Sequence, residues 1–354
     1  MRKISLTIIL VLIFSGSILT LANAANNSNY SESLLDESTD VLSLTPEKTL
    51  LVDKVNSQIQ VLDLSLNKVV WSKKFPVIYD SQVLQNPIKI ILITTERNKL
   101  KKVTLSSDGS VISEQIYSNI KLTEDLKVSW SPKVGQNKET IMMASNGKIN
   151  MYQYPWKKPF VTLSYVMPED KAYEVTTLKD IKLQSGYAVI KINGNNSTQD
   201  QDFYRVINLS SMKKFTIPVE WNITSHFVIE AKELVVITSS QIGNPLGIDT
   251  STKHTIYTRY DLATGTENTS VTRSYALLDS NWSSSYLSRQ LTLIDSEQNK
   301  LTVFDQKGNV INEISLTVSN KELRGKLVGY YKGKLYMLAL GEDGHVELIE
   351  TSMK

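Results

Sequence analysis

Short apolar runs recur along the chain at fairly even intervals, and each is followed by further strand-like segments and turns. The seven runs start 40 to 57 residues apart and are Leu50–Val52, Ile90–Ile93, Ile141–Ala144, Ala188–Ile192, Leu234–Ile237, Leu291–Ile294 and Leu335–Leu340. A continuous apolar run of this length is typical of a strand that is covered on both faces. A repeat of about 47 residues built only from strands and turns predicts an all-β fold, a seven-bladed β-propeller with four-stranded antiparallel blades.

The turns between the runs support this prediction. In the first unit, Ile59–Leu64 alternates between apolar and polar residues and leads through a short turn into Lys68–Phe75. Later units place a glycine at the corresponding joint, as at Gly109, Gly265 and Gly308. Glycine supplies the positive φ that a tight hairpin requires, so each unit is predicted to be a meander of adjacent strands.

The last unit has segments for only three strands, Lys326–Tyr331, Lys334–Leu340 and His345–Thr351, before the chain ends at Lys354. A blade without its outer strand leaves an open edge, which promotes aggregation. The segment Ser31–Glu37 precedes the first unit and is predicted to pair beside the last strand and close the ring. The alternative is that residues 26–40 form a disordered acidic tether.

The N-terminus has the three parts of a secretory signal peptide. Arg2 and Lys3 form a basic head, residues 4–21 carry no charge, and Ala22-Asn23-Ala24 offers a cleavage site. We therefore expect a signal peptide at 1–24, an N-terminal segment at 25–40 and a propeller domain at 41–354. The protein is expected to be secreted, extracellular or associated with the cell wall, without a membrane span after cleavage. An uncleaved membrane anchor is the alternative reading.

Composition narrows the classes of partner. The formal net charge is +3 and falls to +1 without Arg2 and Lys3, so the chain lacks the basic excess typical of nucleic-acid binding. The sequence contains no cysteine, which rules out disulfides, thiolate metal sites and cysteine nucleophiles. Export without cysteine favours a Gram-positive bacterial origin. We expect a monomer whose partner is an unknown protein or a cell-wall glycan.

The first unit resembles the surface-layer and quinoprotein-like type of propeller repeat. The matching residues are Asp40-Val41, Thr45-Pro46, Lys48–Val52, Val61–Asp63 and Lys68–Trp71. Ser129–Pro132 followed by Thr140–Met143 looks like the related repeat of the periplasmic TolB propellers. The resemblance implies four-stranded blades with a tryptophan, here Trp71, packed between them. Quinoprotein enzymes of this class use longer chains, calcium and often adjacent cysteines, so the resemblance argues against a quinone cofactor.

Catalytic and metal-binding motifs are not evident. His226, His254 and His345 are far apart in sequence, and no glycine-rich phosphate loop or Gly-x-Ser-x-Gly elbow occurs. Asn193–Asp202 is rich in oxygen ligands but lacks the order of a calcium loop, so a polar hairpin loop is the preferred reading. We predict no metal site and no cofactor.

The leading hypothesis for function is a non-catalytic binding or scaffold module, and whether the protein is an enzyme is left open. The first alternative is an extracellular hydrolase or lyase with carboxylates at the channel mouth, for which Asp53, Glu96 and Asp295 are candidates. A second alternative is a passive cell-wall protein or one that protects its producer against an exported toxin.

Two adjacent units have long segments between their second and third strands, Asn193–Asp202 and Ser239–Lys253. In a four-stranded blade these loops and the connections between blades leave the ring at the same end. Long loops on a rigid scaffold are common sites of ligand contact. The ligand is therefore predicted to bind over the fourth to sixth blades, although these loops could also lack any partner. The candidate residues are Asp200, Asp202, Trp221, His226, Asn244, Asp249 and Trp282.

Overall fold

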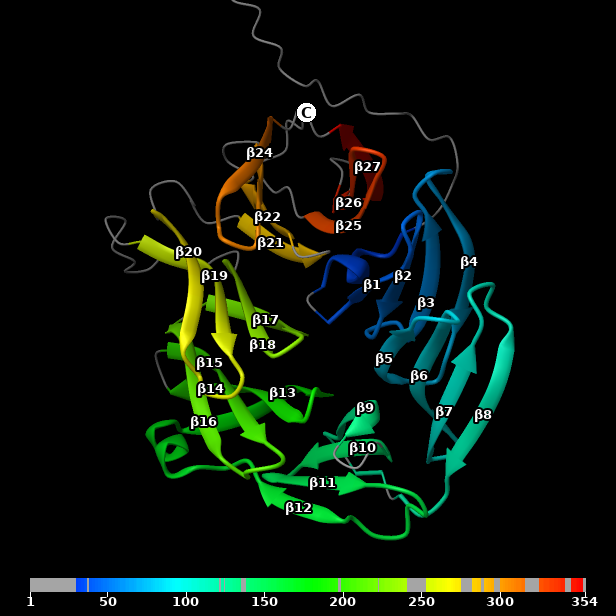
Figure 1. Ribbon diagram of the computed structural model, residues 1–354, viewed down its shortest axis with the longest axis vertical. Helices are drawn as coiled ribbons and strands as arrows, with labels where there is room; N and C mark the ends of the chain where they lie inside the picture. Colours follow the sequence, from blue (N-terminus) through cyan, green and yellow to red (C-terminus); the bar gives the residue numbers. More distant parts are fainter. Residues whose placement is uncertain are drawn as a thin grey trace, which may run out of the picture.

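The computed structural model is a ring of seven antiparallel sheets around one axis (Figure 1), as the apolar runs predict. It describes residues 30–36, 38–120, 122–123, 125–134, 138–196, 199–221, 223–240, 253–274, 282–287, 290–295, 300–315, 325–340 and 345–352. Within these ranges six blades have four strands and the seventh has three. The predicted fold class, an all-β seven-bladed propeller, is confirmed. No helix among the described residues has the length and apolarity that a membrane span requires.

Each blade is a simple meander of neighbouring strands. The first strands, nearest the axis in Figure 1, are β1 (Asp40–Thr45), β5 (Ile78–Leu84), β9 (Lys127–Val134), β13 (Val175–Gln184), β17 (Ile223–Glu230), β21 (Trp282–Leu287) and β25 (Gly325–Tyr331). The second strands are β2 (Lys48–Asp53), β6 (Lys89–Glu96), β10 (Lys138–Ser145), β14 (Tyr187–Asn196), β18 (Glu233–Ser240), β22 (Gln290–Asp295) and β26 (Lys334–Leu340). The third strands are β3 (Gln58–Asp63), β7 (Lys99–Leu105), β11 (Lys148–Tyr152), β15 (Gln199–Asn208), β19 (Lys253–Asp261), β23 (Lys300–Phe304) and β27 (Val346–Ser352). The outer strands are β4 (Lys68–Lys74), β8 (Val111–Tyr117), β12 (Val161–Ser164), β16 (Lys214–Trp221), β20 (Glu267–Ser274) and β24 (Val310–Ser315).

The seven apolar runs all lie in second strands, where neighbouring blades cover both faces of the sheet. In β2, for example, Leu50, Leu51 and Val52 are fully buried, although they point alternately to opposite faces. By contrast, the outer strand β4 alternates between exposed and half-buried residues. Burial therefore decreases from the second strand to the rim, which explains why the continuous runs mark the blades in the sequence.

Glycines in the outer hairpins let neighbouring blades approach closely. Gly109, Gly265 and Gly308 have φ of 84°, 73° and 81°, which confirms the predicted turns. A Cβ on Gly109 would lie 3.1 Å from the ring of Trp71 in the preceding blade, and Trp71 Nε1 donates a hydrogen bond to the Ser107 carbonyl oxygen over 3.1 Å. The predicted packing of Trp71 between blades is confirmed, with the side chain half-buried.

The same contact recurs around the ring. Phe215 of β16 lies over Gly265, and Val271 of β20 lies over Gly308, each within 2.8 Å of the position that a glycine Cβ would occupy. In each case an apolar side chain of one outer strand fills the space beside the hairpin glycine of the next blade. This repeated contact fixes the spacing of the blades at the rim.

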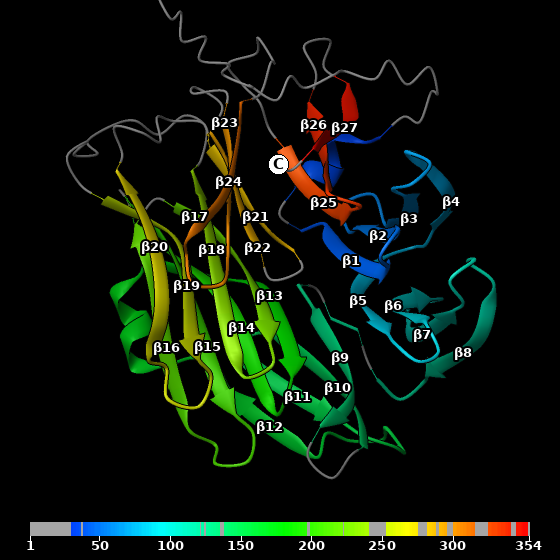
Figure 2. The ribbon, with the colours of Figure 1, turned by 45° about the horizontal axis from the view of Figure 1, so that its top comes forward.

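The N-terminal segment closes the ring between the first and last blades. Residues Glu32–Leu35 form a short 3-10 helix, η1, which lies against β2, β25 and β26 (Figures 1 and 2). Leu34 is 1% exposed and packs in a cluster with residues of the first and seventh blades. Tyr30 forms an antiparallel β-bridge with Val346 on the free edge of β27.

The segment lies where it was predicted, but its predicted strand conformation is wrong. The segment Ser31–Glu37 was expected to be extended beside His345–Thr351, but η1 occupies most of it, and the pairing falls on Tyr30 alone within the described residues. The reason is tertiary packing, since Leu34 is buried among residues of the first and seventh blades. The predicted signal peptide, residues 1–24, lies outside the described residues.

Candidate functional site

Charged side chains from the first strands meet across the axis of the ring. Lys182 of β13 lies 2.7 Å from Asp80 of β5, although these strands belong to the fourth and second blades. The ion pair therefore joins two blades that are not neighbours in the ring, because the third blade, with β9 as its first strand, lies between them. The residues around the axis are therefore close enough for side chains of non-adjacent blades to bind one another.

Asp80 is the centre of this first cluster. It is 3% exposed, and its second carboxylate oxygen accepts hydrogen bonds from the Trp130 backbone nitrogen over 2.7 Å and the Ser129 hydroxyl over 3.2 Å. The Ser129 oxygen in turn accepts from the Leu183 backbone nitrogen over 2.9 Å. One carboxylate thus connects the second, third and fourth blades.

Asp40, at the start of β1, extends the cluster to the first blade. It lies 3.1 Å from Lys54 and accepts a hydrogen bond from the Ser81 hydroxyl over 2.7 Å. Burial alone favours the neutral carboxyl, but Lys54 and Lys182 nearby lower the pKa of Asp40 below its usual range. Likewise, burial opposes the charge on Lys54, yet Asp40, Asp180 and Asp80 raise its pKa. Both groups are charged at neutral pH.

A second cluster lies between the fourth and fifth blades. Lys191 of β14 is 3.0 Å from Asp202 of β15, and the same carboxylate accepts from the Ser225 hydroxyl over 2.8 Å and the Ser225 backbone nitrogen over 3.1 Å. The hydroxyls of Tyr204 and Ser225 are 2.7 Å apart. Asp202 is 4% exposed, so this network connects the two blades beneath the surface.

His226 is the residue after Ser225 on β17. Its Nδ1 atom is buried and has no hydrogen-bond partner among the described residues. Burial, together with the charges of Lys326 and Lys191, lowers the pKa of His226 to about 3. Lys326 itself donates to the carbonyl oxygens of Asp36 and Thr39 over 2.6 and 2.7 Å. His226 is therefore a neutral imidazole near two ammonium groups, close to the segment that closes the ring.

The chemistry of these clusters is that of paired charges. A general acid at neutral pH needs a carboxyl group whose pKa is raised. Nearby lysines instead lower the pKa of Asp40. Asp80 and Asp202 each form an ion pair with a lysine and accept further hydrogen bonds. The described residues contain no group of three His, Asp or Glu side chains that could hold a metal ion. What these clusters provide is contact between blades, through the Lys182–Asp80 ion pair and through the hydrogen bonds of Ser81 to Asp40 and of Ser225 to Asp202.

Of the predicted binding residues, the structure places Asp200, Asp202 and His226 in the fourth and fifth blades. The segment Asn193–Asp202 is a polar hairpin, as preferred from the sequence, but the prediction of a long loop is wrong, because β14 and β15 stay paired as far as Asn196 opposite Gln199. Asn195 Nδ2 donates to Asp200, and Asn193 Nδ2 donates to Asp202 over 3.2 Å. These side chains therefore bond across the hairpin instead of forming a calcium loop.

The remaining predicted residues lie at strand ends or outside the described chain. Trp221 ends β16 and Trp282 begins β21, so their backbone positions agree with a location at the end where blades connect. Asn244 and Asp249 lie outside the described residues, as does most of Ser239–Lys253. The prediction that these residues contact a ligand stays a prediction.

The carboxylates proposed for an enzyme do not meet among the described side chains. Asp53 caps the turn after β2 by accepting from the Asn56 backbone nitrogen over 2.8 Å, and it also accepts from Ser33. Glu96 pairs with Lys101 across a hairpin over 2.6 Å. Asp295 ends β22, and its side chain is not described. Asp53 and Glu96 thus have local structural roles.

Sequence reasoning did not identify the axial residues Asp40, Asp80 and Lys182, nor Lys191 in the second cluster. The available signal was the contrast between polar residues in the first strands and apolar runs in the second strands. The Lys182–Asp80 pair could not be read from this contrast, because it joins two blades that are far apart in sequence.

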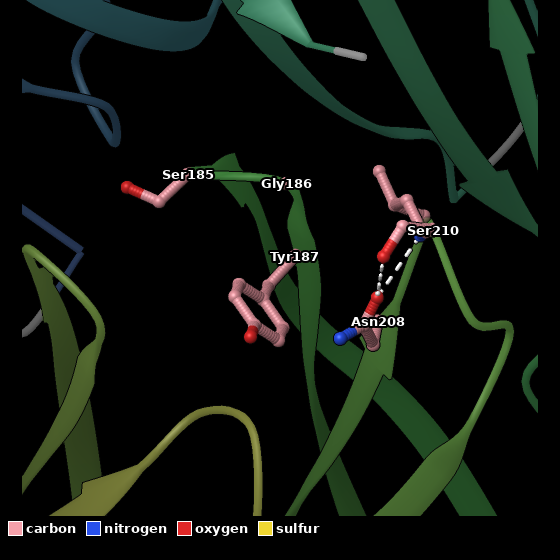
Figure 3. Close-up of a pocket in the computed structure, with 6 residues that line it drawn as sticks. Ser185, Gly186, Tyr187, Asn208 and Ser210 are labelled. Atoms are coloured by element: carbon pink, nitrogen blue, oxygen red, sulfur yellow. Dashed lines mark hydrogen bonds between the residues drawn. The ribbon is translucent and has the colours of Figure 1, made fainter.

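A shallow hollow of about 190 Å³ lies at the opposite end of the fourth blade, between the β13–β14 and β15–β16 turns (Figure 3). Asn208 accepts hydrogen bonds from the Ser210 backbone nitrogen over 3.0 Å and hydroxyl over 2.7 Å, as the dashed lines show. The hollow is smaller than the roughly 300–1,000 Å³ of most small-molecule sites. The Asn208 side-chain oxygen is already bonded to Ser210, and the hollow is small, so we assign it no ligand.

No protein-family model matches the sequence, and no curated protein matches it significantly. Solved structures do match. The β-propeller domain of Cps50 (Swd1) from Myceliophteria thermophila is 11% identical over 90% of this chain and 97% of that chain, with a TM-score of 0.50. Hydrazine synthase from Kuenenia stuttgartiensis is 12% identical over 89% and 95%, also with a TM-score of 0.50. Hsv2 from Kluyveromyces lactis is 12% identical over 89% and 98%, with a TM-score of 0.46.

At these identities the likeness shows the fold alone, a β-propeller. The matches with a TM-score of 0.50 do not show the surface-layer, quinoprotein or TolB type of repeat that the first and third units resemble. The comparisons therefore support the propeller architecture without supporting that subtype.

Proposed function

We propose that this protein is an exported, non-catalytic binding propeller that acts at the cell surface. The observation that carries the proposal is the pairing of three aspartates in the two charged clusters with lysines. Asp40, Asp80 and Asp202 each lie within 3.1 Å of a lysine ammonium. Such groups stabilise the ring in their charged forms and are poorly suited to donate or abstract protons at neutral pH.

Export is proposed from the N-terminal sequence, in which a basic head, an uncharged stretch and Ala22-Asn23-Ala24 follow one another. A chain without cysteine needs no oxidising compartment for disulfides, so its stability must come from burial in the seven blades. The surface-layer-like repeat subtype remains a proposal that depends on the residues around Trp71 and Trp130.

The proposed contact surface is the end of the ring at which blades connect, over the fourth to sixth blades. The strands β13, β14 and β15 have ten residues each and extend the fourth blade, shown in green in Figure 2. Asp200 and His226 lie on the fourth and fifth blades, and Trp221, Asn244, Asp249 and Trp282 are further members of the proposed set. Asp202, the seventh predicted residue, is 4% exposed and lies beneath this surface. A cell-wall glycan or a surface protein is the proposed partner, bound by a monomer.

The test uses the mature chain from residue 25 and purified peptidoglycan, together with an array of cell-wall glycans. A variant in which residues 241–252 are replaced by Asn-Gly should lose binding and keep its melting temperature. Met212→Ser, in the β15–β16 turn at the opposite end of the fourth blade, is the matched control and should bind normally. Equal binding by the shortened variant would place the site elsewhere.

The rival enzyme reading is tested with panels of glycans and lactones. We expect no turnover by the mature protein. Turnover that disappears in folded Glu96→Gln or Asp295→Asn variants would overturn the non-catalytic proposal.

A further inference from the structure

The third blade carries an excess of positive charge. Residues 127–164 contain six lysines and one glutamate, a net charge of +5, whereas the whole chain carries +3. The six are Lys127, Lys133, Lys138, Lys148, Lys157 and Lys158. Four of them, Lys138, Lys148, Lys157 and Lys158, are exposed. One blade therefore concentrates the basic charge of a protein that is otherwise close to neutral.

The single glutamate of this blade, Glu139, does not balance the exposed lysines. Its carboxylate lies 2.6 Å from Lys102 of the second blade and accepts hydrogen bonds from Trp130 Nε1 over 2.8 Å and the Tyr117 hydroxyl over 2.7 Å. Burial would raise its pKa, but these donors lower the pKa of Glu139 below its usual range. The negative charge of Glu139 is therefore paired within the contact between the second and third blades and does not offset the exposed lysines.

The loop between β11 and β12, residues 153–160, presents two of these lysines together with aromatic rings. Tyr154 is 82% exposed and Phe160 is 50% exposed, and they flank the exposed Lys157 and Lys158. Exposed aromatic rings and lysines in one short loop form a surface with both apolar area and positive charge. Such a combination calls for a partner that offers an apolar layer beside negative charge.

The loop is held in place by its own backbone and by one buried ring. The Phe160 backbone nitrogen donates to the Met151 carbonyl oxygen over 2.9 Å, and the Trp156 nitrogen donates to the Gln153 carbonyl oxygen over 2.7 Å. Trp156 is buried, with its ring centroid 4.9 Å from that of Tyr117 in an edge-to-face contact. The aromatic and basic side chains are thus displayed on an anchored support.

We propose that this loop docks the protein onto the surface of an anionic lipid bilayer. Tyr154 and Phe160 enter the interfacial layer, where aromatic side chains are favoured, and Lys157 and Lys158 bind lipid phosphates. A soluble polyanion such as a phosphate-rich wall polymer would engage the lysines but would leave the Phe160 ring in water. The exposed rings therefore favour the bilayer. This surface is separate from the proposed ligand surface over the fourth to sixth blades.

The test is sedimentation of the mature protein with phosphatidylglycerol vesicles and with phosphatidylcholine vesicles. Binding should be selective for phosphatidylglycerol. Lys157→Ser with Lys158→Ser, and separately Tyr154→Ser with Phe160→Ser, should each weaken it at least about tenfold. The matched control is Leu66→Ser with Lys68→Ser, which removes an exposed apolar residue and a lysine from the first blade and should bind normally. All three variants replace exposed side chains and should keep the melting temperature.

A second measurement separates a bilayer from a polyanion. In a Tyr154→Trp variant, fluorescence should be quenched by phosphatidylglycerol with brominated acyl chains and should not change with soluble poly(glycerol phosphate). The proposal would be overturned by unchanged vesicle binding of the Tyr154→Ser, Phe160→Ser variant, by absence of binding to phosphatidylglycerol vesicles, or by poly(glycerol phosphate) binding that matches vesicle binding.

Discussion

Lysine serves two different purposes at the axis of the ring and on the third blade. At the axis, Lys54 and Lys182 lie within 3.1 Å of Asp40 and Asp80. On the third blade, Lys157 and Lys158 are exposed beside Tyr154 and Phe160, and the glutamate of that blade is held by Lys102. The same residue type thus cross-links blades at the centre and leaves basic charge exposed at the periphery.

The difference shows how surroundings decide the role of a charge. Removing a buried partner leaves an uncompensated charge at large cost, whereas an exposed charge is solvated and contributes little to stability. Charges at the axis should therefore govern folding, and charges on the third blade should govern binding with little effect on folding. Each prediction below tests one side of this comparison.

The largest expected effect is at Asp80. Asp80→Ala would leave Lys182, whose side chain is 25% exposed, without its ion-pair partner and the buried Trp130 backbone nitrogen without its acceptor. It should lower the free energy of unfolding by about 3–5 kcal/mol. Glu96→Gln, which removes an ion pair whose carboxylate is 40% exposed, is the control and should cost less than about 1 kcal/mol. Chemical denaturation measures both. Similar costs for the two variants would remove the distinction between axis and surface.

The second largest loss of stability is expected when the segment that closes the ring is altered. Leu34→Ala should cost about 2–4 kcal/mol, because a fully buried side chain is lost between the first and seventh blades. Deleting residues 26–39 should destabilise the ring by at least as much. A melting temperature unchanged by both alterations would mean that the segment is a tether and does not support the ring.

Loss of an uncharged packing contact at the rim should lower the free energy of unfolding by an intermediate amount. Trp71→Ala removes a half-buried ring that packs against Gly109 and should cost about 2 kcal/mol, less than the loss of a fully buried tryptophan. Val70→Ala, at an exposed position of the same strand, is the control and should cost less than about 0.5 kcal/mol. Equal costs would place Trp71 at the surface.

The smallest effect is a dependence on pH at His226. Its folded-state pKa of about 3 lies below the unfolded value of about 6.5, so the unfolded chain binds the proton first as pH falls. The stabilisation is complete above pH 6.5 and should decrease by about 1–2 kcal/mol between pH 6.5 and pH 5. His226→Gln should flatten this part of the profile, and His345→Gln, at an exposed position, should leave it unchanged. A profile that His226→Gln does not alter would show that the imidazole is not buried.

The architecture could be predicted from the sequence because the signals for it are local. Runs such as Leu50–Val52 and turns such as Asp108-Gly109 depend on residues close together in the chain, and both lie where they were expected. The axial clusters could not be predicted, because Asp80 and Lys182 are 102 residues apart and meet only when the ring is complete. The segment Ser31–Glu37 was assigned to the right place but in the wrong conformation, since the buried position of Leu34 depends on the seventh blade.

A double-mutant cycle between Asp80 and Lys182 tests the central claim most directly, namely that charges at the axis stabilise the ring by pairing across it. The free energies of unfolding of Asp80→Asn, Lys182→Met and the double variant would be measured by chemical denaturation. A direct ion pair predicts a coupling energy of at least about 1 kcal/mol, so that the double variant loses clearly less than the sum of the single losses. Additive losses, with a coupling within about 0.3 kcal/mol of zero, would contradict the claim.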